Sequence, residues 1–380
     1  MHQVEPPFAK SGGSREVRIA LVGEAQGATE QMFGAPFLGS SGFELATMLY
    51  ASDIASSAPE YPDGSALNPL DFIEWWRTQS NCFTTNVIAG RPSPTSNQFE
   101  LLCGTKAEVG GKAYEFPAVK KSKYLRPEYL PELERLQMEL MQVRPNIIVA
   151  LGGVASWALL RASAITQIRG AVAPCALVPG AKVLPTFHPQ YVLRVWKDRP
   201  IVLCDLAKVK RESEFVEWRR PKRNVIVNPT LEELRKWARE TLAAPPPIMG
   251  CDIETFNGQI ESIGFARSRS EAIVCPFIAK PNWHSYWPTH AEECEARVLC
   301  QELLGSGIPI VGQNFLYDLQ YLLREGFRPR RCTYDTMLLH HSMYPELQKS
   351  LGFLGSCYTD EPAWKLMRKR AKEEELKRDD

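Results

Sequence analysis

The stretch VRIALVGEAQGATEQMFGAPFLGSSG, residues 17–42, decides how the N-terminal part of the chain is interpreted. Residues 17–22 are rich in apolar and β-branched types, as in a strand buried in a parallel sheet. The loop that follows contains a glycine every few residues, together with Glu24 and the pair Pro36-Phe37. Glycine permits positive φ and close backbone approach, so the loop either turns tightly or lies against a ligand.

Three further apolar segments resemble this first strand. They are NCFTTNVI (81–88), PNIIVALGG (145–153) and AKVLPTF (181–187). A segment with helical apolar spacing, residues 127–143, precedes the second of these. Strands that alternate with helices predict an α/β domain with a parallel sheet and ligand loops at the carboxyl ends of its strands. We therefore expect the loops after residues 22, 86 and 187 to lie at one edge of that sheet.

Composition sets broad limits on the protein. The chain has 380 residues, which is long enough for two domains. Its net charge is +1, so the protein as a whole has no strong positive field that would attract nucleic acid. Contacts with nucleic acid would need local basic patches such as VKKSKYLR or EWRRPKR. No 18-residue apolar run or signal peptide is present, and the ten cysteines form no CxxC pair. We expect a cytoplasmic protein with reduced thiols and no membrane partner.

A domain boundary is predicted near residue 218. The charged segment KVKRESEFVEWRRPKRN (208–224) precedes a new strand and a helix, and this helix starts with a capping-box pattern from Thr230 to Glu233. The stiff connector AAPPP leads into the strand IMGCDIET. The sequence therefore predicts a disordered N-terminus over 1–15, one domain over 16–218 and a second over 219–380.

Three residues of the first domain are candidates for a ligand pocket. Phe37 lies in the glycine loop, whereas Asn86 and His188 each follow a buried strand. An aromatic face, an amide and an imidazole together suit a planar ligand with polar edges, such as a flipped nucleobase. Taken singly, Phe37 would be a core residue, Asn86 a turn former and His188 a surface residue.

The motifs GEAQG, GAPFLGSSG, TNVIAGRP, IIVALGGVASWALL and LPTFHPQYVLR occur in an order that resembles the uracil-DNA glycosylase superfamily, closest to its family four. The resemblance covers roughly residues 16–215, with an insertion around 104–123. It implies that Phe37 stacks on the extruded uracil and that Asn86 pairs with its edge. It also implies that His188 holds O2 and stabilises the uracil anion as it leaves.

The same resemblance implies that Gly23, Glu24 and Gly27 shape the pocket floor and help to position water. Two positions depart from the family pattern, because Gln26 replaces a proline and Gln190 follows His188-Pro189 where the family has serine. These departures leave open a second interpretation, in which the domain is a catalytically silent module that binds DNA and tethers or guides a polymerase.

Family four also holds an iron–sulfur cluster through four cysteines. This chain has no cysteine pair before the first strand, and Gly90 occupies the position of another expected ligand. Cys103 lies near a further ligand position, but one cysteine cannot hold a cluster. We therefore expect no iron–sulfur cluster.

The second domain carries paired acids. Asp252 and Glu254 in GCDIET point to the same face of a strand, because side chains two residues apart do so. Asp318 follows a buried strand in VGQNFLYDLQYL. These three carboxylates predict a site for Mg²⁺ or Mn²⁺ that catalyses phosphodiester hydrolysis. The alternatives are an ordinary exposed strand and a helix cap at Asp318.

This half resembles the 3′–5′ proofreading exonuclease domain of family-A DNA polymerases, through DIET and GQNFLYDLQYL. The third motif of that family, Tyr-x-x-x-Asp, does not occur, since Tyr358 is followed by Thr359 and Asp360. We therefore expect an exonuclease domain that is incomplete at its C-terminus. A zinc site at His284, His290, Cys294 and Cys300 was the weaker alternative, because this spacing fits no structural zinc pattern.

Together the patterns predict a uracil-DNA-glycosylase-like three-layer sandwich with a central parallel sheet, followed by a partial ribonuclease-H-like (DnaQ-type) exonuclease α/β domain. Such a fusion resembles the N-terminal part of a phage-type family-A polymerase in a bacterial or phage-infected cell. The expected partners are DNA, either single-stranded or primer-template, and the remaining polymerase domains or a polymerase subunit.

Overall fold

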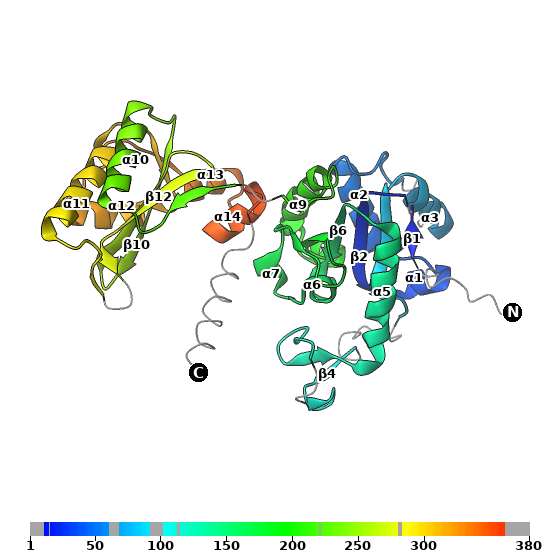
Figure 1. Cartoon of the computed structure of the whole chain (residues 1–380). Coiled ribbons are helices and arrows are strands. Elements are labelled where there is room, and N and C mark those ends of the chain that lie inside the picture. Colours follow the sequence, from blue (N-terminus) through cyan, green and yellow to red (C-terminus); the bar gives the residue numbers. More distant parts are fainter. Residues whose placement is uncertain are drawn as a thin grey trace. The chain divides into compact units, whose positions relative to one another are not determined.

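The computed structural model describes residues 11–14, 16–60, 68–91, 102–111, 115–219, 222–279 and 283–361. The chain divides into two compact units, which Figure 1 shows. The first comprises residues up to Trp218 together with residues from Gly352 onward, and the second comprises Arg219–Leu351. The second unit is therefore shorter than the predicted domain 219–380, because the described residues after Leu351 pack with the first unit.

The first unit is built on a six-stranded sheet of order β1-β3-β2-β6-β8-β7. The four central strands are parallel, and the two short edge strands run antiparallel to their neighbours. The strands are β1 (Gly12–Gly13), β2 (Ile19–Ala25), β3 (Cys82–Ile88), β6 (Ile147–Leu151), β7 (Ala173–Pro174) and β8 (Lys182–Thr186). The prediction of a parallel α/β sheet in this half is thus confirmed.

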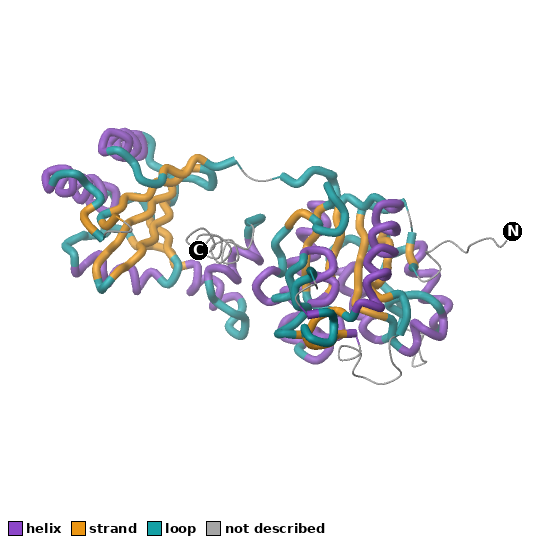
Figure 2. Tube along the Cα trace, turned by 60° about the horizontal axis from the view of Figure 1, so that its bottom comes forward, coloured by secondary structure: helices purple, strands orange, loops and turns teal. Residues whose placement is uncertain are grey.

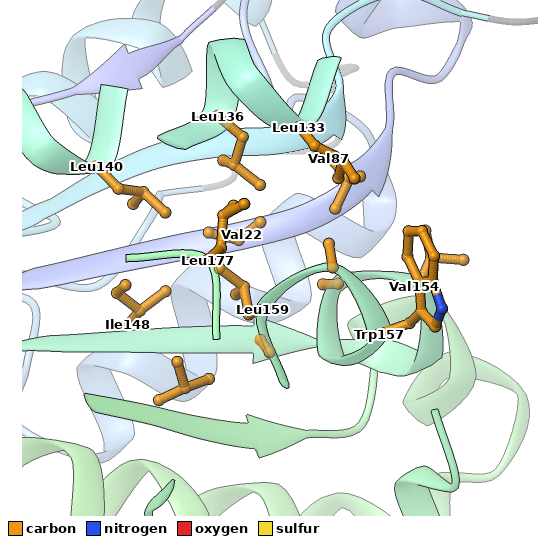
Figure 3. Close-up of a cluster of buried hydrophobic side chains, with 14 of the residues drawn as sticks. Val22, Val87, Leu133, Leu136, Leu140, Ile148, Val154, Trp157, Leu159 and Leu177 are labelled. Carbon is orange, nitrogen blue, oxygen red and sulfur yellow. The ribbon is translucent and has the colours of Figure 1, made fainter. Parts of the chain in front are cut away.

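Helices cover both faces of this sheet. The helices of this unit are α1 (Ala28–Phe33), α2 (Ser40–Ala51), α3 (Pro69–Thr78), α5 (Leu130–Val143), α6 (Gly152–Leu160), α7 (Ile165–Ile168), α8 (Pro189–Arg194) and α9 (Arg199–Glu212), and most of α14 (Leu351–Tyr358) packs with it outside the sheet. Helices α5 and α6 bury one face through a cluster that includes Val22 and Ile148 (Figure 3). The neighbouring strand residues point to the opposite face, where α9 packs on β6 and β8 and α2 packs on α9.

The apolar spacing of α5 explains its position. Leu133, Leu136 and Leu140 recur every three or four residues and are all buried against the strands (Figure 3). Fully burying one such side chain contributes roughly 1.5–3 kcal/mol relative to leaving it exposed. Trp157 of α6 is fully buried in the same cluster and donates from Nε1 to the carbonyl of Pro117, 2.9 Å away.

The N-terminal segment differs from the predicted disorder over residues 1–15. Gly12 and Gly13 form strand β1, which pairs with Thr84 and Phe83 of β3. Residues 1–10 and 15 lie outside the described residues. The insertion around residues 104–123 contributes a two-stranded ribbon, β4 (Cys103–Thr105) and β5 (Lys123–Leu125), and the short turn η2 (Pro127–Tyr129) follows it.

The second unit has its own sheet, of order β16-β15-β10-β11-β12-β9 (Figure 2). Its strands are β9 (Asn224–Ile226), β10 (Met249–Phe256), β11 (Gln259–Ala266), β12 (Glu271–Pro276), β15 (Ile310–Gly312) and β16 (Cys332–Asp335), with the separate pair β13 (Ile278–Ala279) and β14 (His284–Ser285). Its helices are α10 (Leu231–Ala243), α11 (His290–Gly305), α12 (Phe315–Arg324) and α13 (Thr336–Met343). Helix α10 begins with the predicted capping box.

The long strands β10, β11 and β12 form an antiparallel meander, and β15 extends the sheet parallel to β10. Buried residues of α10, α11 and α12 form one core with these strands. In the part of the chain that the structure describes, no helix is long and apolar enough to cross a membrane. All ten cysteines are free thiols.

Candidate active sites

The parallel sheet of the first unit brings the predicted loops to one edge. Strands β2, β3 and β8 run in the same direction, so Gly23, Asn86 and His188 follow or occupy their carboxyl ends. The register pairs Gly23 directly with Asn86. The predicted alignment of these residues at one sheet edge is therefore present in the structure.

Gly23 is the point where two other predicted site residues, Phe37 and Asn86, come close to the backbone of β2. A Cβ placed on Gly23 would lie 2.3 Å from Oδ1 of Asn86 and 2.8 Å from Cζ of Phe37. Real Cβ atoms do not approach other atoms this closely, so only glycine fits here without displacing a neighbour. The structure thus brings Gly23, Phe37 and Asn86 together, with Phe37 5% and Asn86 4% exposed.

Phe37 has an unusual backbone conformation. Its φ is +61°, a region that bulky residues rarely adopt. Two contacts hold it there: Trp76 donates from Nε1 to the Phe37 carbonyl over 3.0 Å, and Glu30 Oε1 accepts from the amides of Leu38 and Gly39. Strain of this kind persists only where the surroundings impose it, and it is often found at ligand sites. Sequence reasoning missed Glu30 and Trp76 as supports of this loop.

A buried ion pair fixes the end of β3. Arg135 of α5 donates from Nη2 to the carbonyls of Asn86 and Val87, at 2.6 and 3.1 Å. The same guanidinium pairs with Glu139, which is fully buried and accepts a 2.6 Å hydrogen bond from the hydroxyl of Thr85. The Asn86 backbone is therefore held by α5. Its side-chain amide carries both a donor and an acceptor that a ligand could use.

His188 is held as a neutral donor. Its Nδ1 accepts from the amide of Gln190 over 3.1 Å and caps helix α8, which assigns the imidazole proton to Nε2. Burial, followed by the charge of Arg194, lowers the pKa of His188 to about 4. Gly152 lies beside the ring with φ +87°, and a Cβ there would lie 3.1 Å from His188 Cβ. His188 follows β8, two strands away from β2.

Glu24 and the rest of the glycine loop lie at the end of β2. Burial raises the pKa of Glu24, and the charge of Lys120 from the inserted segment partly opposes this shift. Gly27 belongs to the packing of the loop, since a Cβ there would lie 2.4 Å from Glu30 Oε2. Gln26 is buried, and its backbone N–H donates to the carbonyl of Gly90 over 3.4 Å.

A sequence model of the uracil DNA glycosylase superfamily matches residues 10–218. The chain belongs to this superfamily. It is similar to the type-4 uracil-DNA glycosylase of Thermotoga maritima, with 27% identity over 206 residues that cover 52% of this chain and 79% of the relative. Family membership agrees with the pocket residues at the sheet edge, although it does not by itself assign their roles.

Solved structures similar to part of this chain include the EXD2 exonuclease domain. The form soaked in Mg and GMP has 17% identity and a TM-score of 0.25, and covers 36% of this chain and 70% of that chain. The form soaked in Mn and GMP has 17% identity and a TM-score of 0.23, with the same coverage. Scores this low do not establish a shared fold.

The acids of the second unit lie as the sequence pattern predicts. Cys251 and Ile253 of β10 point into the core, whereas Asp252 and Glu254 are exposed on the other face of the strand. Asp318 lies in the first turn of α12, is 4% exposed, and accepts from the amide of Ile253 over 2.9 Å. The carboxylate of Asp318 therefore lies against the strand that carries the other two acids.

The three carboxylates influence one another. Although Asp252 is exposed on its strand face, partial desolvation by the surrounding protein, and then the charges of Asp318 and Glu254, raise its pKa to about 6. Burial raises the pKa of Asp318 as well, although its hydrogen bond from Ile253 opposes the shift. The alternative in which Asp318 caps the helix is wrong, because Asn314 occupies the cap position.

Within the described ranges, no group of three His, Cys, Asp or Glu side chains is placed to bind one ion jointly. The zinc alternative fails on the same ground, since Cys300 is buried in the core whereas Cys294 is exposed on the surface of the helix.

Asp335 is an acid near this site that sequence reasoning missed. Its two oxygens accept from the amides of Asn314, Phe315 and Met337, at 2.8–3.1 Å. Asp335 therefore fixes the loop before α12 and the start of α13. Nearby, the hydroxyls of Tyr317 and Thr255 lie 3.0 Å apart, which joins α12 to the end of β10.

Proposed function

We propose that the first unit binds DNA, accepts an extruded uracil and hydrolyses its N-glycosidic bond. The observation that carries this proposal is the convergence of Gly23, Phe37 and Asn86 at the edge where His188 presents a neutral imidazole. The match to the uracil DNA glycosylase superfamily and the similarity to a type-4 enzyme support it.

The pocket residues would act on the base and on the charge that develops when the bond breaks. Phe37 would stack on the uracil ring, and Asn86 would pair with its polar edge through one donor and one acceptor. As the C1′–N1 bond breaks, its electron pair stays with uracil and negative charge develops on the O2 atom. The Nε2–H of His188 would donate to that oxygen, because a donor aimed at the position where charge develops stabilises the transition state.

A water molecule completes the reaction. It would attack C1′ of the sugar and lose a proton, which leaves an abasic site and, after protonation, free uracil. Glu24 at the end of β2 would help to position this water. Its pKa is raised by burial, so the neutral and ionised carboxyls are closer in free energy than in an exposed glutamate.

The alternative function is a silent pocket that grips DNA without cutting the base. Gln26, buried in the loop beside the pocket, is the residue that favours this alternative, because it departs from the family pattern. A uracil-containing single-stranded oligonucleotide separates the two functions: alkali cleaves the strand wherever uracil has been removed. Cleavage that is lost in Asn86→Ala and retained in the exposed control Asn224→Ala supports the enzyme. Binding without cleavage at stoichiometric protein supports the silent module.

We propose for the second unit a ribonuclease-H-like fold and a role in 3′–5′ phosphodiester hydrolysis, as part of a family-A polymerase. The support is the pair Asp252 and Glu254 on one strand face with Asp318 against the same strand. These carboxylates offer the oxygen ligands that Mg²⁺ or Mn²⁺ prefers. Such ions, when bound, activate water and stabilise charge on the phosphate.

The third exonuclease motif does not occur in this sequence, so we expect no 3′ digestion by the chain as given. The measurement is Mg²⁺-dependent shortening of a 5′-labelled single strand. Digestion that disappears in Asp252→Asn would show that the site is complete and would contradict this expectation. Binding of Mn²⁺, followed by electron paramagnetic resonance, tests the metal proposal independently of activity.

A further inference from the structure

The described residues after Leu351 pack on the first unit, although they follow the second unit in sequence. Helix α14 (Leu351–Tyr358) buries Phe353 and Leu354, and both helix and following turn contact residues of α9 and the segment after α7. These contacts centre on two buried cationic side chains, Arg169 and Lys208, each 2% exposed.

Lys208 of α9 is satisfied by backbone carbonyls. Its Nζ donates to the carbonyls of Gly170 at 2.9 Å, Thr359 at 2.6 Å and Ser356. Ser356 and Thr359 lie in and just after the last turn of α14, where helix carbonyls lack partners within the helix. A cation at this end is also favoured by the helix dipole. Lys208 therefore occupies the C-terminal end of α14 as a capping cation.

Arg169 joins the same helix to the core of the first unit. Its Nε donates to Asp205 over 3.0 Å and its Nη2 completes a two-point pair with this buried carboxylate. Its Nη1 donates to the hydroxyl of Ser356 over 2.8 Å, and the guanidinium lies 5.5 Å from the ring centre of Phe353. One face of the guanidinium thus contacts the core and another contacts α14.

Lys208 and Arg169 would lose hydrogen bonds if α14 were removed, and this loss indicates that they form a binding surface for the helix. Asp205 already has Arg169 and the hydroxyl of Thr186, 2.6 Å away, as its partners. Without α14, Lys208 would lose its hydrogen bonds to Ser356 and Thr359 and would keep the one to the carbonyl of Gly170. With α14 in place the ammonium is 2% exposed and satisfied by three carbonyls, so this surface is suited to a helix end that supplies carbonyls.

We propose that residues 352–361 are a docking segment, and that Lys208 and Arg169 form its receptor on the glycosylase-like unit. The chain leaves the first unit at Trp218 and returns to it at Gly352. The unit Arg219–Leu351 is consequently inserted in the sequence of the first unit, between Trp218 and Gly352. This proposal does not depend on glycosylase or exonuclease activity.

Hydrogen–deuterium exchange of the full chain, read by mass spectrometry, tests the docking. We expect slow exchange over residues 353–359 in the wild type. In Lys208→Met the exchange rate should rise at least about tenfold, because lowering the free energy of local opening by about 1.4 kcal/mol makes exchange tenfold faster. Lys210→Met is the matched control, since Lys210 lies on the same helix but is 45% exposed and pairs with Asp53. It should exchange like the wild type.

A double variant in the segment itself, Phe353→Ala with Ser356→Ala, guards against general destabilisation by Lys208→Met. It should accelerate exchange over 353–359 while amides of β6 and β8 keep their wild-type protection. Exchange of the wild-type segment at free-peptide rates would overturn the proposal. So would unchanged protection of the segment in both Lys208→Met and the double variant.

Discussion

Replacing His188 by asparagine separates two tasks of its imidazole. Nδ1 caps helix α8 by accepting from the Gln190 amide, whereas Nε2–H is the donor proposed for the departing uracil. Asparagine is a favourable N-cap residue, so His188→Asn keeps an acceptor at the cap but removes the donor from the position of Nε2. His188→Ala removes both.

The structure sets the expected magnitudes. Loss of one donor to a developing oxyanion costs about 10²–10³-fold in kcat, so both variants should lose at least that much uracil release. Loss of an N-cap costs about 1 kcal/mol, which lowers Tm by about 2–4 °C in a domain of this size. Only His188→Ala should show this loss of stability.

Single-turnover release of uracil from single-stranded DNA measures the chemical step, and circular dichroism melting measures stability. Because the pKa of His188 is lowered to about 4, the imidazole should stay neutral from pH 5 to 8, with Nδ1 accepting from Gln190 and Nε2–H donating, and release should not change between pH 7 and 5 through His188. If His188 instead titrated at the ordinary histidine pKa of about 6.5, the rate of uracil release would change between pH 7 and 5. Wild-type rates in His188→Asn, or equal losses of stability in both variants, would refute this account of the histidine.

Two further predictions follow from the packing and the charges. Gly23→Ala should lower uracil release and cost about 1–3 kcal/mol of stability, since its Cβ would overlap Asn86 and Phe37; unchanged uracil affinity and Tm would show that these residues do not converge there. Asp252→Asn should raise the Tm of the second unit at pH 8 more than at pH 4. The reason is that the pKa of Asp252 is raised to about 6 in the folded state, so its contribution to stability is present at low pH and is lost as pH rises through 6. Melting curves at the two pH values test this, and an equal effect at both would contradict it; millimolar Mg²⁺ should reduce the difference if the carboxylates bind the ion.

The strands and loops of the first unit were predictable because their signals are local. Buried strands are apolar runs; the glycine loop and His188 come at or after the ends of such runs, and Asn86 lies near the carboxyl end of strand β3. A parallel sheet then places all three at one edge without further information. It was also predictable that Asp252 and Glu254 point to the same outward face of β10, because the alternation of side chains along a strand is a local property.

The supporting contacts were not predictable, because they join residues far apart in sequence. Trp76 holds the Phe37 carbonyl across 39 residues, and Arg135 holds the Asn86 carbonyl across 49. Lys208 binds the Ser356 carbonyl across 148 residues. No periodicity in the sequence links such pairs, and the charge of Lys208 alone gives no sign that the residue is buried. The positive φ of Phe37 likewise depends on the surrounding fold rather than on the residue type.

Release of uracil by the wild-type chain is the most direct test of the central claim, that the pocket at the ends of β2, β3 and β8 excises the base. Single-stranded DNA with one uracil is incubated with excess protein and heated in alkali, beside Asn86→Ala and the control Asn224→Ala. The account predicts strand cleavage at the uracil by the wild type and the control and a loss of at least about 10²-fold in Asn86→Ala. Uracil-containing DNA that binds but remains uncut by all three proteins would contradict it.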